Sequence, residues 1–476
     1  MASEINVREL VLVTLMDIDK GTKHASEAIS STLRNYQYMS KQERSFYTRL
    51  CEGTLEYQIQ LDYIINQVSK TPVNKCKPLI RNLFRMSLYQ LRFMDSVPEE
   101  AVCNEAVKLA KKKGFQSLSG FVNGVLRNLA RQQERILLPS RAENEIKYLS
   151  VAYSIPEWLV EQLLEWYSLE VVETMLQAFL QEAPLTVRVN LARTNKEEVL
   201  RELQKEGIQA EAGFYADNAL RLSGINYVNR IKAFRQGWIT VQDESSILQG
   251  NLVQTKAGDM ILDVCAAPGG KSLHAAERLF LAENLSQSGD ISHDSGIVIA
   301  RDISEGKVER IEENIERMSY SNLKVEVWNA LTLDKSKIKN VDIVMADVPC
   351  SGLGVIGRKP DIKYHVTKEQ LDELQVLQRD ILQVVIQYVE EEGYFLYSTC
   401  TVNPNENEQQ VAWIQEQFPF EPVDIEPLLP SRLVEQVREQ PGTNLQQGYC
   451  TLLPGKQDCD GFFFALLRKK KAAKGC

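Results

Sequence analysis

Short apolar runs alternate with helical stretches over the second half of the chain, and this alternation constrains the fold more than any other feature. The runs are 260–264, 297–300, 323–327, 343–346 and 394–397. Most are separated by the helical stretches 271–281, 305–318 and 368–391. Helices cover both faces of a parallel sheet, so its strands read as continuous apolar segments. We therefore predict an α/β domain over 238–470, with 461–467 as an antiparallel last strand because no helix follows it.

The first 140 residues read as helices throughout. Two apolar sets recur at helical spacing: Ile80, Leu83, Phe84, Leu88 and Leu91, then Phe121, Val122, Val125, Leu126 and Leu129. Pro98 and Gly114 lie between periodic stretches, as helix breakers do. The pattern predicts an all-α domain over 1–140.

A third sequence pattern covers the stretch between these two regions. Residues 184–190 alternate like a strand, 195–206 have a helical composition, and 220–222 return to an extended pattern. This β-α-β order predicts a small α+β subdomain over 150–237. The 15 residues at 282–296 are polar and rich in turn formers, which predicts a surface insertion.

Composition excludes several classes of protein. A charged fraction of 25% and a hydrophobic fraction of 44% exclude disorder as the main state. No stretch reaches the roughly 18 apolar residues that a membrane span needs, and the N-terminus has no secretory pattern. The nine cysteines form no CxxC pair and only four histidines are present, so we expect no metal site. We expect a cytoplasmic protein, and no oligomer is implied.

Charge is distributed unevenly. Although the net charge is −9, residues 1–150 hold 22 Lys and Arg against 16 Asp and Glu, an excess of six positive charges. The remaining residues hold 33 against 48. Because phosphate attraction depends on the local field, the N-terminal region is the candidate nucleic-acid module, although ordinary surface variation gives a similar imbalance.

Polar segments follow the predicted strands. The first runs from Asp263 to Ser272, with small residues that let a ligand approach the backbone at the start of a helix. It matches neither the dinucleotide fingerprint nor the complete phosphate loop. Asp302 ends the next strand, where an acidic residue binds ribose hydroxyls in nucleotide-binding folds, or caps a helix. Asn329 follows the third strand as a candidate for an adenine edge, or as a turn residue.

Two further segments carry cysteines. Asp347–Gly354 follows the fourth strand and contains Cys350, and Tyr397–Thr401 follows the fifth and contains Cys400. The carboxyl ends of parallel strands meet at one edge, so all these segments are expected to converge there. A single cysteine is usually a small buried hydrophobe, but two at strand ends beside a ligand loop favour chemistry.

These segments resemble the motifs of the RNA cytosine-C5 methyltransferases. Residues 106–111 and 121–127 also resemble a NusB-like RNA-binding domain, which opens the bacterial 16S ribosomal RNA members of the methyltransferase B type. Residues 361–364 and 460–463 extend the match, so it spans nearly the whole chain. The resemblance implies an NusB-like helical domain, a small α+β subdomain and a Rossmann-like methyltransferase domain.

The chemistry of this family requires a thiolate. C5 of cytosine is a weak nucleophile, and a thiolate that adds to C6 turns C5 into an enamine carbon that accepts a methyl group. The resemblance assigns the nucleophile to Cys400 and the release of product to Cys350. It places Asp347 on the cytosine edge, and Lys271 near the base or the thiolate.

The implied cofactor is S-adenosylmethionine. By resemblance, its candidate contacts are Cys265, Ala266, Ala267, Pro268, Gly269, Gly270, Lys271, Asp302, Asn329 and Asp347. Asn329 stands where the family usually has Asp, and an amide still accepts and donates hydrogen bonds. The implied partner is small-subunit ribosomal RNA, whose phosphates would meet the cations Arg44, Arg81, Arg85, Lys111, Lys112, Lys113 and Arg127.

Four other readings remain open at this point. A transfer RNA substrate would keep the chemistry, and a DNA cytosine-C5 methyltransferase would use Cys350 as the nucleophile. A non-catalytic RNA-binding factor would need only the helical domain. A dehydrogenase would need the glycine fingerprint that the chain lacks.

Overall fold

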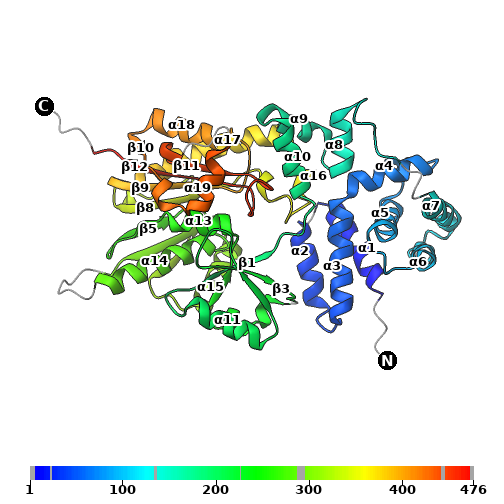
Figure 1. The fold of residues 1–476 in the computed structure, drawn as a ribbon, viewed down its shortest axis with the longest axis horizontal. Coiled ribbons are helices and arrows are strands. Elements are labelled where there is room, and N and C mark those ends of the chain that lie inside the picture. Colours follow the sequence, from blue (N-terminus) through cyan, green and yellow to red (C-terminus); the bar gives the residue numbers. More distant parts are fainter. Residues whose placement is uncertain are drawn as a thin grey trace. The chain divides into compact units, whose positions relative to one another are not determined.

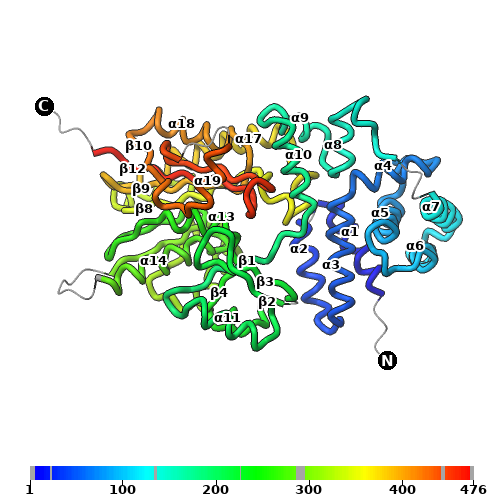
Figure 2. The backbone as a smooth tube through the Cα atoms, viewed as in Figure 1, coloured from blue at the N-terminus to red at the C-terminus, as the bar shows by residue number. Residues whose placement is uncertain are grey.

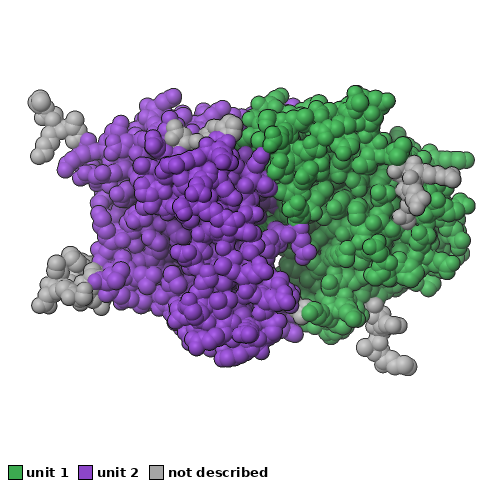
Figure 3. Space-filling model, viewed as in Figure 1, with its two compact units in different colours: residues 1–181, 356–365 green, residues 182–355, 366–476 purple. Residues whose placement is uncertain are grey.

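The computed structural model describes residues 6–21, 24–132, 137–225, 227–286, 295–440 and 445–471. The chain divides into two compact units, which Figure 3 shows in different colours. The first consists of residues 1–181 together with 356–365, and the second of 182–355 together with 366–476. The predicted domain ranges 1–140, 150–237 and 238–470 stay a prediction.

Helices build the first unit (Figure 1). They are α1 (Val7–Asp19), α2 (Ala25–Asn35), α3 (Lys41–Glu56), α4 (Gln58–Val68), α5 (Pro78–Phe93), α6 (Glu99–Lys112), α7 (Ser119–Gln132), α8 (Glu145–Tyr153), α9 (Glu157–Trp166), α10 (Leu169–Ala178) and α16 (Ile362–His365). Local sequence fixes their starts: Ser40 and Glu43 form a capping box before α3, and Pro78 opens α5.

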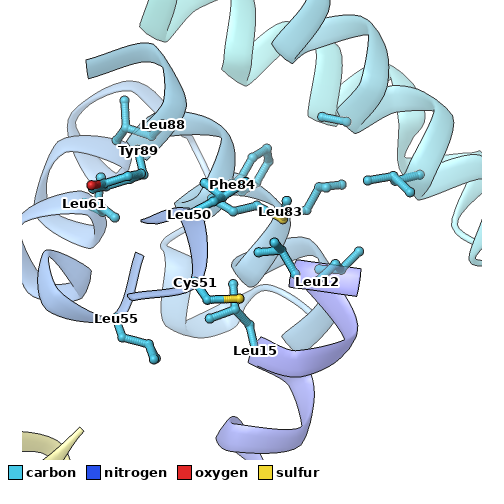
Figure 4. Packing of buried hydrophobic residues seen from close by; sticks show 14 of the residues in the cluster. Leu12, Leu15, Leu50, Cys51, Leu55, Leu61, Leu83, Phe84, Leu88 and Tyr89 are labelled. Carbon is cyan, nitrogen blue, oxygen red and sulfur yellow. The ribbon is translucent and has the colours of Figure 1, made fainter. Parts of the chain in front are cut away.

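The core of this unit is formed by leucines and aromatic rings on facing helices. Figure 4 shows Leu12 and Leu15 of α1 near Cys51 of α3, with Leu83 and Phe84 of α5 beside them. All five are at most 1% exposed. Each such side chain contributes about 1.5–3 kcal/mol when it leaves water.

Residues 356–365 belong to the first unit although they lie far along the chain. Lys363 Nζ donates to the carbonyl oxygen of Glu56 at 2.8 Å, and Tyr364 Oη donates to that of Leu55 at 2.8 Å. The Asp361 carboxylate accepts from the backbone N–H of Ala25 at 3.0 Å. These contacts satisfy backbone groups at the end of α3 and the start of α2, which have no partner within their own helices.

A small antiparallel sheet opens the second unit, with strand order β2-β3-β1-β4 (Figure 2). Its strands are β1 (Leu185–Val189), β2 (Gln209–Ala212), β3 (Ala219–Ser223) and β4 (Ile239–Val241), and its helices are α11 (Lys196–Lys205) and α12 (Lys232–Arg235). The strand predicted over 184–190 and the helix predicted over 195–206 are present as β1 and α11. The polar residues Thr186 and Arg188 of β1 are buried like its valines.

The large sheet has the order β10-β12-β9-β8-β5-β6-β7, and β11 pairs with β12. Its strands are β5 (Met260–Asp263), β6 (Ile297–Asp302), β7 (Leu323–Val327), β8 (Val341–Asp347), β9 (Val389–Thr399), β10 (Phe420–Pro422), β11 (Tyr449–Leu452) and β12 (Phe462–Lys469). The five strands β5 to β9 are parallel, and β12 runs antiparallel to β9, which confirms the antiparallel last strand.

Helices cover both faces of the large sheet (Figure 1). One face packs on α13 (Glu244–Asn251), α14 (Gly270–Ser286), α15 (Glu305–Met318) and α19 (Ser431–Arg438). The other packs on α17 (Lys368–Val385) and α18 (Glu408–Gln417). Successive residues of β8 alternate between the two faces, with Ile343 on the first and Val344 on the second. This two-sided burial explains why the strands read as unbroken apolar runs.

One predicted helix ends earlier than expected, and part of the predicted insertion lies outside the described residues. The helix predicted over 368–391 is wrong at its end: α17 stops at Val385, and β9 begins at Val389. The glutamates at 390–392 have a helical composition, but Val389 pairs with Val341 of β8, so sheet pairing overrides local preference. For the predicted insertion 282–296, α14 continues to Ser286, and 287–294 lie outside the described residues.

Candidate active site

The order of the strands brings the predicted segments to one edge of the large sheet. From β5 the chain proceeds through β6 and β7 on one side and then returns to β8 and β9 on the other. Ligands in open α/β sheets bind outside the carboxyl ends of the strands where this order reverses. The segments after β5, β6, β8 and β9 therefore surround one site.

The loop between β5 and α14 is held by buried polar contacts. Asp263 Oδ2 accepts from Ser272 Oγ at 2.6 Å, and burial raises the pKa of the Asp263 carboxyl to about 6. Gly269 has φ +100°, a conformation that a side chain would strain. A Cβ at Gly270 would meet nothing within 4 Å, so the first turn of α14 is open for a ligand.

Asp302 fastens this loop to the end of β6. Its Oδ2 accepts from the backbone N–H of Ala267 at 2.9 Å, and its Oδ1 lies 2.9 Å from Lys307 Nζ. The side chain is 5% exposed. Asn329, just after β7, is exposed and its Oδ1 accepts from the N–H of Leu331 at 3.0 Å. The ribose and adenine contacts of these two residues stay predictions.

Lys271 and Asp347 form an ion pair between the first turn of α14 and the end of β8. Ser398 Oγ, on β9, donates to Asp347 Oδ1 at 3.0 Å. The Lys271 ammonium also lies 4.9 Å from the centre of the Phe462 ring on β12. The pair is thus shared by four elements, and a carboxylate and an ammonium are held at the point where the strand order reverses.

The two cysteines of the predicted segments meet. Cys350 Sγ lies 3.4 Å from Cys400 Sγ. The hydrogen bond with Cys400 and then burial raise the pKa of the Cys350 thiol well above its usual value. The two sulfurs are therefore close enough for one thiol to donate to the other.

Backbone contacts bring the two cysteine loops together. The N–H of Gly354 donates to the carbonyl oxygen of Cys400 at 3.1 Å, and the N–H of Gly461 donates to that of Gly354 at 2.9 Å. A Cβ at Gly354 would come within 2.1 Å of the Gly461 carbonyl oxygen, so only glycine fits there.

Cys265 differs from this pair. Burial, and then the charge of Asp263, raise the pKa of its thiol. A thiol that stays protonated is a poor nucleophile, because the thiolate is the reactive form. Cys265 is therefore a lining residue of the loop after β5.

The cations predicted to bind RNA all lie in the first unit but do not form one cluster. Arg85 is a correction: it is buried, with bonds of 2.7 and 2.6 Å to the Asp62 carboxylate, so its guanidinium does not face a phosphate. Arg81 lies 3.3 Å from Asp19. Lys112 and Lys113 both pair with Glu9, at 2.6 and 2.8 Å.

The remaining predicted cations face outward to different degrees. Arg44 Nη1 donates to the carbonyl oxygen of Leu33 at 3.3 Å, and Arg127 Nε donates to Asn123 Oδ1 at 3.1 Å. Lys111 is exposed at the end of α6. The RNA contacts of Arg44, Lys111 and Arg127 stay predictions.

Four residues of the site were missing from the predicted set. Ser398 stands two residues before Cys400, and its place in the Ser-Thr-Cys segment was the available signal. Phe462 lies in the 460–463 motif, and Ser351 directly follows Cys350. Glu406 had no signal, because its partner Ser351 lies 55 residues away.

Within the described ranges, no three His, Cys, Asp or Glu side chains gather as a metal ion would require. No described helix combines the length and apolar character needed to cross a membrane.

The open first turn of α14 offers N–H groups to an anionic group such as a carboxylate, beside a buried acidic residue on β6.

Comparison with protein families gives three matches along the chain. The 16S rRNA methyltransferase RsmB/F family matches residues 251–468, the NusB family matches 5–131, and an RsmF/B-like ferredoxin-like domain matches 155–229.

Curated relatives match over the whole length. The chain is 32% identical to a probable ribosomal RNA small subunit methyltransferase B of Bacillus subtilis over 98% of this chain and 99% of that protein. It is also 32% identical to ribosomal RNA small subunit methyltransferase B of Serratia proteamaculans, over 98% of this chain and 100% of that protein.

Solved structures share the fold. The crystal structure of PH0851 covers 98% of this chain and 99% of its own, with TM-score 0.79 and 22% identity. The structure of NSun6 from Pyrococcus horikoshii with SFG covers 66% of this chain and 98% of its own, with TM-score 0.56 and 21% identity. These likenesses confirm the fold class: an NusB-like helical domain, a small domain and a mixed-sheet methyltransferase domain.

Proposed function

The chain belongs to the RsmB/F family of 16S ribosomal RNA methyltransferases, and from this premise we propose that it methylates C5 of a cytosine in small-subunit ribosomal RNA through a covalent bond to Cys400. The observation that carries the proposal is the approach of the Cys350 and Cys400 sulfurs to 3.4 Å, at the edge that also holds Lys271 and Asp347. An enzyme that methylated an oxygen or nitrogen atom of a nucleic acid would need no such pair of thiols.

S-adenosylmethionine is the cofactor that fits the loop after β5, and when bound it supplies the methyl group. Family membership supports this assignment, as does the relative solved with SFG, an S-adenosylmethionine analogue. The residues that would hold it are the backbone from Cys265 to Gly270, with Asp302 toward the ribose and Asn329 toward the adenine. Gly270 leaves room for this, because a Cβ there would meet nothing within 4 Å, whereas a Cβ at Gly269 would meet Ile311 at 3.0 Å.

Cys400 is the nucleophile in this proposal. Its thiolate adds to C6 of the cytosine, and the electron pair that accumulates on the ring makes C5 nucleophilic. Cys350 is the sulfur that keeps its proton, because its pKa is raised by Cys400 and by burial. Cys400, which directly follows β9, is the sulfur that attacks as a thiolate in this proposal.

The groups around the thiols support the later steps. Asp347 would bind the cytosine edge and favour charge on the ring, while Lys271 holds the Asp347 carboxylate in place. A water molecule takes the C5 proton, the electron pair of that C–H bond re-forms the double bond between C5 and C6, and the Cys400 sulfur leaves C6 as a thiolate, which restores the aromatic ring. We assign the release step to Cys350, whose thiol lies beside the sulfur that leaves.

The substrate proposal rests on the family and on the first unit. The curated relatives are named for the ribosomal small subunit, and the NusB-family match covers residues 5–131. A target cytosine must leave its stack to reach a thiol, which selects loops or single strands of structured RNA.

Substitution of each thiol tests the proposal. With 16S ribosomal RNA and labelled S-adenosylmethionine, Cys400→Ser should give no 5-methylcytosine. Cys350→Ser should retain a protein–RNA adduct that survives denaturing electrophoresis. The reverse pattern, with Cys350→Ser inactive and Cys400→Ser active, would show that Cys350 is the nucleophile, as in the DNA enzymes. Bisulfite sequencing of ribosomal RNA from a deletion strain would identify the cytosine, and unchanged methylation there would contradict the substrate.

A further inference from the structure

A buried carboxylate connects the loops of the two cysteines. Glu406 lies between β9 and α18, and its side chain is fully buried. Its Oε2 accepts from the backbone N–H of Ser351 at 2.9 Å, and its Oε1 accepts from the Ser351 hydroxyl. Ser351 directly follows Cys350, so both bonds act on the backbone next to that thiol.

The same carboxylate is connected to the loop of Cys400. Asn403 Nδ2 donates to Glu406 Oε1 at 2.9 Å. The Ser351 hydroxyl also lies 2.7 Å from the hydroxyl of Thr401, the residue after Cys400. Ser351 and Thr401, the residues that follow the two cysteines, are therefore bonded to each other, and Ser351 is also bonded to Glu406.

A third element completes the network. Gln378 of α17 donates from Nε2 to Glu406 Oε2 at 2.9 Å and to the carbonyl oxygen of Pro349 at 2.9 Å. Pro349 precedes Cys350, so the Cys350 loop is held on both sides of the thiol. Asp347 at the end of β8 pairs with the Lys271 ammonium, whereas the donors that bond to Glu406 are neutral.

Only an acceptor satisfies this arrangement. Four donors converge on the two oxygens of Glu406, and an ionised carboxylate is the side chain that accepts without donating. A glutamine amide would direct N–H groups at other N–H groups. Burying a carboxylate costs free energy unless its oxygens are hydrogen-bonded, so a site like this has a specific geometric role.

We propose that Glu406 is a positioning residue for the reaction, whose carboxylate holds the Cys350 loop against the Cys400 loop so that both sulfurs reach the same pyrimidine ring. This inference rests on the proposed function, because it takes Cys400 as the nucleophile and Cys350 as the release group.

Loss of Glu406 should affect the two thiols unequally. Cys400 directly follows β9, which pairs with β8 on one side and β12 on the other, so the sheet fixes its backbone. Cys350 lies three residues past the end of β8, in a loop that Glu406 and Gln378 hold. Without Glu406, Cys350 moves more than Cys400, and release should fail before addition does.

The test compares Glu406→Gln with a matched control, Glu408→Gln. Glu408 is half-buried and lies two residues further along, and its carboxylate accepts from the hydroxyl of Thr451 on β11. Glu406→Gln should lower kcat by about 10- to 100-fold, since a small misplacement of a reacting group has effects of this size. KM for RNA should fall with kcat, because slow breakdown of a covalent intermediate lowers both. It should also accumulate the denaturation-resistant RNA adduct, as Cys350→Ser does. Glu408→Gln should form no adduct and bind S-adenosylmethionine as Glu406→Gln does.

A second variant keeps the test decisive if Glu406→Gln does not fold. Ser351→Ala removes the hydroxyl bonded to Glu406 and Thr401 but leaves the backbone N–H bond. It should show the same adduct in a smaller amount. Equal losses of activity in Glu406→Gln and Glu408→Gln without an adduct, or wild-type turnover and no adduct in Ser351→Ala, would overturn the inference. Failure of the proposed function is separate: the wild type would make no 5-methylcytosine, or Cys350→Ser would form no adduct.

Discussion

The edge of the large sheet and the surface of the helical unit hold their charged side chains in different ways. At the sheet edge, Lys271, Asp347 and Ser398 come from three elements and meet in one place. In the helical unit, the cations are divided among separate partners, and Arg85 and Lys112 bond to carboxylates of different helices.

This difference shows what each kind of pattern conveys. A residue at the carboxyl end of a parallel strand has its place fixed by the sheet, so its type and position together indicate a site. The sequence position of a cation on a helix does not show whether its side chain is free to bind a ligand, because a carboxylate from another part of the chain can pair with it. An excess of charge in the sequence therefore indicates which region of the chain binds a ligand, whereas a polar residue at a strand end indicates which side chain does.

The largest effect is expected at the sheet edge. Asp347→Asn removes the charge that Lys271 balances and should lower the single-turnover rate by about 10²- to 10³-fold, as loss of one electrostatic group in an active site does. Asp342→Asn is the control, because Asp342 lies at the other end of β8 and accepts from the N–H of Met260 at 2.7 Å. Similar single-turnover rates for Asp347→Asn and Asp342→Asn would show that carboxylates at the two ends of β8 do not differ in their effect on the reaction.

Arg85 should behave as a structural residue and not as an RNA contact. Arg85→Met leaves the Asp62 carboxylate, which is 28% exposed, without its partner and should lower the free energy of unfolding by about 3 kcal/mol. Urea unfolding measures this loss. RNA affinity of the folded fraction should stay within twofold of the wild type, and a large loss of affinity at full stability would restore Arg85 as a phosphate contact.

Lys363 tests a buried cation of the same unit by pH. Burial lowers the pKa of its ammonium from 10.5 to about 7. Between these values the unfolded chain holds a proton that the folded chain has lost, so the free energy of unfolding rises with pH from 7 toward 10.5. Lys363→Met lacks this rise, so the free energy of unfolding of the wild type should increase by at least about 1 kcal/mol relative to that of Lys363→Met between pH 7 and pH 9.5.

The comparison variant for this experiment is Lys359→Met. Lys359 is exposed in the same segment, so its variant should follow the wild-type pH dependence. Glu56, whose pKa is raised by burial to about 7, acts in the opposite direction: its titration makes the free energy of unfolding fall as the pH rises toward 7. Parallel curves for Lys363→Met and wild type would show that Lys363 keeps its proton in the fold.

The smallest effect is expected at the exposed cations. Lys111→Ala should weaken RNA binding a few-fold and reduce the slope of log affinity against log salt by about 1, since one phosphate contact is lost. Lys112→Ala should change the slope less, because Lys112 already pairs with Glu9 at 2.6 Å. Titrations at several salt concentrations measure both, and equal slopes would show that pairing does not limit availability.

The sequence was sufficient to predict features that are local to a strand. The apolar runs, the polar segments after them and the meeting of Cys350 with Cys400 follow from the rule that parallel strands end at one edge. The antiparallel last strand followed from the missing helix after it.

Features that depend on distant partners were not predictable in this way. Arg85 is buried because Asp62 lies opposite on α4, and Glu406 matters because Ser351 lies beside it in space. The end of α17 at Val385 depends on pairing with β8, which local helix preference does not report. Each of these needs knowledge of which residues become neighbours after folding.

Residues 356–365 also limit how the chain can be divided experimentally. A fragment that began at residue 182 would include this segment but not the carbonyl groups of Leu55 and Glu56 that receive Tyr364 and Lys363. The Lys363 ammonium would be hydrated again. Residues 356–365, which directly follow the Cys350 loop, would lose the hydrogen bonds that hold them. Dissection by truncation would therefore alter the catalytic half as well as remove the helices, and point substitutions are the cleaner way to assign roles to each.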